Sequence, residues 1–237
     1  MNRVAEIFGV SRVLLPVIHP VGRDEAVASV EVAVAAGVKG VFVINQGMSE
    51  QQVLALMRDL HGRHPTLWVG VNLLGFAPAE VLERGLQAGD GRLDGIWSDN
   101  ARIDEDAAQQ PEAAAFVAAR RERGWNGLYF GGVAFKYQRE VADAKLEWAA
   151  RLARGYMDVV CTSGPGTGHE ARVEKVAAMR AGLGTDGALA LASGVTTENV
   201  GNFLPYVDAY LVGTGIEAQL GVLDAGRVAA LHRKISS

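Results

Sequence analysis

Short, nearly continuous apolar runs alternate along the chain with longer stretches in which apolar residues recur at helical spacing. The apolar runs predict eight strands, at residues 13–19, 40–45, 67–72, 94–98, 127–134, 157–161, 188–192 and 209–212. The stretches between them predict helices at residues 24–36, 49–64, 78–88, 112–123, 141–154, 170–182 and 224–234. This alternation is typical of an α/β protein.

Strands that are apolar throughout are buried on both faces, as in a parallel sheet covered by helices. Eight strand units in 237 residues favour a closed (β/α)8 barrel, the TIM barrel, over an open doubly wound sheet. The open sheet would carry G-x-G-x-x-G after its first strand, whereas residues 19–23 read HPVGR. We therefore predict a single barrel domain over residues 1–237, with residues 1–12 as a short lead-in that covers the barrel bottom.

Glycine-containing turns follow the seventh and eighth predicted strands. Glycine lets a backbone turn sharply and approach a ligand, and each turn is expected to open into a helix whose N–H groups point at the same place. Together they predict a phosphate site, which is common after strands seven and eight of such barrels. The alternative is that the glycines serve tight turns only. The predicted phosphate-binding residues are Ser193, Gly194, Val195, Gly213, Thr214 and Gly215.

A third glycine-rich segment follows the sixth predicted strand. Thr167-Gly-His-Glu170 fits a capping box that opens the next helix, and the N–H groups of the loop are suited to fold over a ligand as a lid. A helix entry without a ligand is the alternative. The candidate ligand-binding residues here are Thr162, Ser163, Gly164, Gly166, Thr167 and Gly168.

Other polar residues stand where predicted strands end, which is the active-site face of a barrel. His19 fits either a general acid or base or a hydrogen-bonded structural histidine. Asp99 fits proton abstraction, ribose binding or a loop cap. Lys136 fits phosphate neutralisation, a Schiff base or a plain surface lysine. Asn45 and Asn72 fit sugar-hydroxyl recognition or turn formation.

Composition narrows the function classes. A net charge of −4 gives no broad attraction for nucleic acid or an anionic membrane. One cysteine, Cys161, excludes an internal disulfide and fits a reducing cytosol. No stretch resembles a signal peptide or a membrane span, because Val13–Ile18 is short and interrupted by Pro16. We expect a soluble cytoplasmic protein without a metal or cofactor, since no H-x-E pattern occurs and the H-x-x-H of His61 and His64 lies near a polar helix end.

The sequence also predicts residues that take no part in ligand binding or catalysis. Residues 104–106 are expected to form a solvated acidic surface, and His61 and His64 to be solvated at a helix end. Cys161 is expected to be a small buried residue. Trp125 and Trp148 fit a subunit contact and core packing equally well, so a homo-oligomer stays open.

Three segments resemble the BtpA family: residues 160–168 (VCTSGPGTG), 192–200 (ASGVTTENV) and 207–214 (VDAYLVGT). Ile7-Phe8-Gly9, the strand end His19-Pro20, Gly70-Val-Asn72 and Lys136 fit the same pattern. The segments after His19 and after Asn72, which read PVG and LLGF, depart from it. The turn after strand seven is similar to that of ribulose-phosphate-binding barrels more widely. The resemblance implies a (β/α)8 barrel with a phosphate-type site and says little about the reaction.

The leading hypothesis is an enzyme that acts on a phosphorylated small molecule, of the sugar-phosphate or phosphoribosyl type. Asp99 and His19 would transfer protons, and Lys136 would neutralise charge. The alternative is a non-catalytic BtpA-like protein that binds a phosphometabolite or a protein partner and serves assembly or regulation. A Schiff-base aldolase that uses Lys136 is a third reading.

Overall fold

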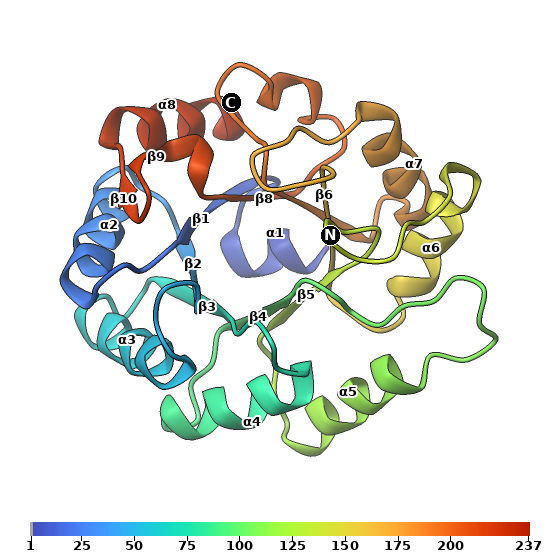
Figure 1. The fold of residues 1–237 in the computed structure, drawn as a ribbon, viewed down its shortest axis with the longest axis horizontal. Coiled ribbons are helices and arrows are strands. Elements are labelled where there is room, and N and C mark those ends of the chain that lie inside the picture. Colours follow the sequence, from blue (N-terminus) through green and yellow to red (C-terminus); the bar gives the residue numbers. More distant parts are fainter. Residues whose placement is uncertain (1) are drawn as a thin grey trace.

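The computed structural model, which describes residues 2–237, contains a closed barrel of eight parallel strands (Figure 1). Each strand pairs with the next along the chain, and the eighth pairs with the first. The predicted TIM barrel is therefore confirmed. The strands are β1 (Val13–Ile18), β2 (Gly40–Ile44), β3 (Trp68–Asn72), β4 (Gly95–Ser98), β5 (Leu128–Gly132), β6 (Val159–Ser163), β7 (Ala188–Ala192) and β8 (Ala209–Val212).

Seven helices form the ring around the barrel in Figure 1. Ser49 caps one of them with a capping box, in which its hydroxyl accepts from the N–H of Gln52 and the Gln52 side chain accepts from the N–H of Ser49. A 3-10 helix at Asp143–Lys145 replaces the start of the helix predicted at 141–154. The ring consists of α2 (Arg23–Ala35), α3 (Glu50–Arg63), α4 (Pro78–Ala88), α5 (Pro111–Glu122), α6 (Leu146–Ala153), α7 (Val173–Leu183) and α8 (Ala225–Ser236).

The barrel interior is filled by side chains from alternate positions of the strands. Part of this interior is aromatic: the Phe42 ring lies edge-on to Trp68 and to Phe130, with ring centroids 5.1 Å apart in both pairs. The opposite side of the strands packs against the helices in a second apolar cluster. The barrel is thus a packed core, and ligand chemistry is confined to its ends.

Helix α1 (Arg3–Phe8) closes the end of the barrel where the strands begin. In the end-on view of Figure 1 it lies inside the ring of strands. Phe8 packs edge-on against Trp68, with centroids 5.4 Å apart, and the Phe8 carbonyl accepts a 2.6 Å bond from Lys39 Nζ. With this end plugged, the opposite end, where the strands terminate, is the open mouth.

An aspartate precedes every second strand from β4 onward and ties it to the strand before it. The carboxylate of Asp94 accepts from the N–H of Val69, that of Asp158 from Tyr129, and that of Asp208 from Leu189. Each carboxylate also binds an arginine that comes from the segments packed around the barrel. These three clamps lie at strand starts, away from the mouth, and we assign them to stability.

Replacing Asp158 by Ala should therefore destabilise the fold by about 1–3 kcal/mol, because the Tyr129 N–H and the half-buried Arg120 guanidinium lose their acceptor. Urea unfolding monitored by tryptophan fluorescence measures the change. Asp186→Ala is the matched control, since the Asp186 side chain is 72% exposed, and its effect should stay within about 0.5 kcal/mol. Equal effects for the two variants would contradict the clamp.

The last third of the chain departs from the predicted alternation. No α-helix follows β7 directly; a 3-10 helix at Val200–Asn202 occupies that connection. After β8 come a three-residue 3-10 helix, Thr214–Ile216, and a hairpin of β9 (Glu217–Gln219) and β10 (Val222–Leu223). The expectation that both glycine turns open into helices is wrong, so helix dipoles do not point at these turns.

Candidate functional site

The mouth of the barrel holds a partly buried carboxylate, Asp99, placed directly after β4. The side-chain amide of Asn72, the last residue of β3, donates a 2.9 Å hydrogen bond to Asp99 Oδ1. A Cβ on Gly132 would lie 2.0 Å from the Asp99 carbonyl oxygen, so glycine is required for the backbone of β5 to pass this close.

Burial raises the pKa of Asp99, while the Asn72 hydrogen bond and the positive charge of Lys136 lower it and only partly offset burial. Asp99 and Asn72 both line a cavity of about 700 Å³ at the ends of β3 and β4. A carboxylate held in one orientation, facing a cavity and with its pKa moved toward neutrality, is suited to general acid–base chemistry.

Lys136 lies in the loop after β5 and connects this part of the mouth to the loop after β6. Its N–H donates to Ser163 Oγ over 2.8 Å, and its Nζ donates to Thr167 Oγ1 over 3.2 Å. The Thr167 N–H in turn bonds the Tyr137 hydroxyl at 3.1 Å. The side chain of Lys136 is therefore held within the mouth and is more than a loose surface lysine.

His19 forms a pair with a residue that sequence reasoning missed. His19 Nδ1 lies 2.8 Å from Glu217 Oε1, and the Glu217 side chain is only 4% exposed. Glu217 also accepts from the Gly221 N–H, across the hairpin that follows β8. A carboxylate that fixes one ring nitrogen leaves the other, Nε2, to act as an acid or base. An isolated acid in the apolar stretch Ile216-Glu217-Ala218, just after a strand end, is the signal that points to it.

The turn after β7 has two consecutive residues in the left-handed region, Ser193 at φ 69° and Gly194 at φ 67°. Among residues 2–237, no protein group accepts from the N–H of Gly194 or of Val195, so neither donor is used within the protein. A Cβ on Gly194 would lie 2.1 Å from the His169 carbonyl oxygen, so the loop after β6 covers one side of the turn.

The turn after β8 packs against its neighbours on two sides. A Cβ on Gly213 would lie 2.4 Å from the His19 ring, and one on Gly215 would lie 2.2 Å from the Val195 carbonyl oxygen. Thr214 between them is exposed. The structure therefore brings His19, both glycine turns and the loop after β6 together, with packing as one reason for the glycines.

The loop after β6 folds back on itself instead of opening a helix at Thr167. Helix α7 begins at Val173 with Arg172 at its cap position, so the predicted capping box is wrong. A Cβ on Gly164 would lie 2.1 Å from the His169 carbonyl oxygen, which explains that glycine. The Gly168 N–H donates to Ser193 Oγ over 2.9 Å and attaches the loop to the turn after β7.

Other predicted ligand-binding residues at the mouth form hydrogen bonds within the protein or are buried in it. Strand β6 continues two residues beyond its predicted end, so Thr162 and Ser163 belong to the strand and are fully buried. Thr162 Oγ1 bonds the Ala134 carbonyl, and Ser163 Oγ bonds the Gly164 carbonyl. Gly166 is buried as well. The Asn45 amide bonds the Leu74 backbone in both directions, which fastens β2 to the next loop.

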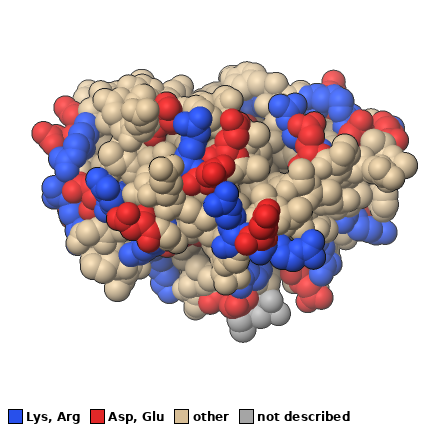
Figure 2. Space-filling model, turned by 90° about the horizontal axis from the view of Figure 1, so that it is seen from below, with Lys and Arg blue, Asp and Glu red and all other residues tan. Residues whose placement is uncertain are grey.

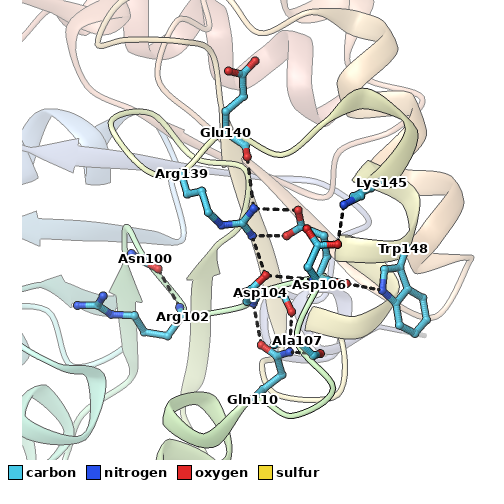
Figure 3. A network of polar contacts seen from close by, with 11 residues as sticks. Asn100, Arg102, Asp104, Asp106, Ala107, Gln110, Arg139, Glu140, Lys145 and Trp148 are labelled. Carbon is cyan, nitrogen blue, oxygen red and sulfur yellow. Dashed lines mark hydrogen bonds and ion pairs between the residues drawn. The ribbon is translucent and has the colours of Figure 1, made fainter.

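In the acidic segment 104–106, Asp104 and Asp106 are exposed as predicted, whereas Glu105 is buried and its predicted solvated state is wrong. The guanidinium of Arg139 reaches across from the loop after β5 to Asp104 and Glu105 (Figure 3). The Glu105 side chain is 2% exposed, and the bond to Arg139 lowers its pKa. Trp148 donates its indole N–H to the Glu105 carbonyl at 3.1 Å. These contacts fix two mouth loops to each other.

The predictions for the other residues without an expected functional role are confirmed in part. His61 is buried and lies 3.0 Å from Asp94, so the expectation of a solvated side chain is wrong there. Trp125 is also buried, whereas the Trp148 side chain remains half exposed. Cys161 is fully buried, as expected, and burial raises the pKa of its thiol well above the usual value, so it is no ready nucleophile.

Three further features concern the whole described chain: surface charge, metal-ligand clusters and membrane-spanning helices. Basic and acidic side chains are interspersed over the face seen in Figure 2. Within residues 2–237 no three His, Cys, Asp or Glu side chains gather as metal ligands. None of the helices in the same range is both long enough and apolar enough to cross a bilayer.

Comparison with known proteins identifies the fold class. No protein-family model and no curated protein matches the chain. Among solved structures, 3-keto-L-gulonate-6-phosphate decarboxylase from Vibrio cholerae O1 biovar El Tor has a TM-score of 0.68 at 15% identity, over 95% of this chain and 98% of that one. Phosphoribosyl anthranilate isomerase from Thermus thermophilus has 0.63 at 16%, over 94% and 98%. The structure named native KDPGal has 0.65 at 17%, over 93% and 92%.

The chain thus shares the (β/α)8 TIM barrel of these proteins, over nearly its whole length. At such identities the likeness concerns the fold.

Proposed function

We propose that the protein is an enzyme that binds a phosphorylated small molecule at the mouth of the barrel. The observation that carries the proposal is Asp99: a partly buried carboxylate, oriented by Asn72, at the edge of a large cavity. Such a group costs stability, because its side-chain hydrogen bond from Asn72 only partly offsets the effect of burial. A role in proton transfer explains why it is there.

Each side chain at the mouth has a role in this proposal. Asp99 acts as the general acid or base, and His19, oriented by Glu217, as the second proton-transfer group. Lys136 offsets negative charge that develops on the substrate. The phosphate would bind at the two glycine turns, where the N–H groups of Gly194 and Val195 have no protein acceptor among residues 2–237. The solved structures with similar folds include phosphoribosyl anthranilate isomerase in complex with a deoxyribulose 5-phosphate compound, which supports a ligand of this type.

We also propose that residues 1–237 form one barrel domain with residues 1–12 as its lead-in, and that the protein works in the cytoplasm without a metal or cofactor. The resemblance of residues 160–168, 192–200 and 207–214 to the BtpA family supports the second candidate, a non-catalytic protein that binds a phosphometabolite or a protein partner.

Thermal stability against a ligand panel tests the phosphate site. The panel holds inorganic phosphate, ribose 5-phosphate, phosphoribosyl pyrophosphate, nucleotides and unphosphorylated sugars. A phosphorylated ligand at about 100 times its dissociation constant should stabilise the protein by roughly 2.7 kcal/mol. A flat response across the panel would reduce the two turns to packing and favour the partner-binding candidate.

Thr214 offers a sharp variant because it is exposed between the two turns and its substitution leaves the packing intact. Thr214→Asp should weaken binding of the phosphorylated ligand by about tenfold or more through charge repulsion, whereas Thr214→Asn, of the same shape, should bind nearly as the parent does. Titration calorimetry of both variants gives the comparison. Gly194 is unsuitable, because any side chain there meets the His169 carbonyl. Equal affinities of the Asp and Asn variants would place the phosphate elsewhere.

A further inference from the structure

A second cavity, of about 520 Å³, lies between the loop after β5, the end of β6 and the start of α7. Four basic side chains line it, against two acidic ones, Glu140 and Asp143. Among residues 2–237 neither turn of the proposed phosphate site lines this cavity. Its basic residues are Lys136, Arg139, Arg172 and Lys175.

The two arginines of this cavity are paired and the two lysines are not. Arg139 bonds Glu105, and Arg172 bonds Asp143. Lys175 Nζ bonds only backbone carbonyls, those of Ala134 and Ser163, the latter at 2.7 Å. Lys136 Nζ bonds the Thr167 hydroxyl. Within residues 2–237 neither ammonium group has a carboxylate within salt-bridge distance, so the cavity wall carries uncompensated positive charge.

Lys175 is the more unusual of the two, because it lies on α7 beneath the loop after β5. The pKa of Lys175 is lowered to about 8, mainly by burial and also by the nearby charge of Arg172, while Asp143 and Cys161 act in the opposite direction. A lysine ammonium kept from water without a counter-ion destabilises the empty protein. An anion in the cavity would remove that penalty.

The backbone around Lys175 is built to hold it in place. Ala134, a non-glycine residue, adopts φ 48°, and its carbonyl accepts both from Lys175 Nζ and from Thr162 Oγ1 at 3.1 Å. A residue without a glycine's freedom rests in this conformation only when its surroundings fix it. The loop after β6 then links this cavity to the turn after β7, since Thr167 contacts Lys136 and the next residue, Gly168, bonds Ser193.

We propose that this cavity binds an oxyanion of the ligand, a phosphate or a carboxylate, between the ammonium groups of Lys175 and Lys136. The substrate is then a small molecule with two anionic groups, one at the glycine turns and one at Lys175. The assignment of the first group rests on the proposed function. The oxyanion site at Lys175 stands on its own cavity and charges.

The direct test is the titration of Lys175 followed by NMR in protein labelled with ¹³C at the lysine side chains. The lysines are Lys39, Lys136, Lys145, Lys175 and Lys234, and single Lys→Met variants assign their signals. Should Lys175→Met fail to fold, Lys175 is assigned by elimination from the other four. Each titration is run in sodium chloride, sodium phosphate and sodium acetate at equal ionic strength. The midpoint of Lys175, near pH 8 in chloride, should rise by about one pH unit in phosphate or acetate.

Comparing the anions shows which group the cavity binds, and a second lysine serves as the control. A response to phosphate alone identifies a phosphoryl group, and a response to acetate identifies a carboxylate. Exposed Lys234, on α8, should titrate identically in all three salts. Equal Lys175 midpoints in all three salts would overturn the proposal. Thr214→Asp separates the two sites, because it should weaken phosphate binding at the glycine turns by about tenfold or more and leave the Lys175 titration unchanged.

Discussion

Asp99→Asn is expected to lower kcat by about 10²–10⁴-fold on the substrate that the ligand panel selects, with a much smaller change in KM. Asparagine keeps the shape and can still face Asn72, but it can neither take up nor release a proton. Steady-state kinetics with the purified variant measures the effect. Asp186→Asn, at a 72% exposed position, is the control and should leave kcat unchanged.

The same variant carries a stability signature that a scaffold residue would not give. Burial raises the folded-state pKa of Asp99 above its usual value of 3.8, so its carboxyl favours the folded state at low pH and loses that contribution as pH rises through the folded-state pKa. Asp99→Asn should therefore be more stable than the parent at pH 7, and the gap should narrow toward pH 4. Thermal unfolding at the two pH values measures this.

Together the two readouts separate the candidate functions. Lost turnover with gained stability at pH 7 means that the carboxylate is retained for chemistry at a cost to the fold. Lost stability at pH 7 would make Asp99 a structural anchor for its loop, and the enzyme hypothesis would lose the observation that carries it. Unchanged turnover on a bound substrate would transfer the acid–base role to the pair of His19 and Glu217.

The barrel itself was readable from the sequence because its strands are buried on both faces. A run such as Ala188–Ala192 has no polar position to place in water, and its bounds match the structure without a shift. The mouth was readable for the same reason, since Asn72 and Asp99 stand where apolar runs stop. The end of a strand can be predicted because it depends only on neighbouring residues in the sequence, where an apolar run gives way to polar residues.

The missed features depend on contacts between distant segments. His19 and Glu217 are 198 residues apart, and no local pattern pairs them. Lys175 reads as one more charged residue on an amphipathic helix, and only the fold places the loop after β5 over it. The acid at Glu105 reads as solvated because its partner, Arg139, comes from another loop. The packing of the loop after β6 over Gly194 is likewise a contact between distant segments that no local pattern records.

Three positions in the barrel interior are glycine because the indole of Trp68 fills the space that a side chain there would need, which only the structure reveals. A Cβ on Gly95 would lie 2.2 Å from the Trp68 ring, and one on Gly70 would lie 2.6 Å from it. Gly40 meets the same ring at 3.0 Å. The tryptophan therefore fills space that inward-facing side chains of β2, β3 and β4 would otherwise occupy.

Trp68→Ala should consequently destabilise the barrel by about 3–5 kcal/mol, since none of the three glycines can fill the cavity. Gly95→Ala should destabilise it by about 1–3 kcal/mol through overpacking against the ring. In the double variant Trp68→Ala/Gly95→Ala the second cost should vanish, because the added methyl enters vacated space. Guanidinium unfolding of the four proteins completes the double-mutant cycle.

Gly62→Ala, on α3 with nothing within 4 Å of its added Cβ, is the control and should stabilise by about 0.5–1 kcal/mol. Strictly additive costs in the cycle would mean that Trp68 and Gly95 do not share the space that the structure assigns to them.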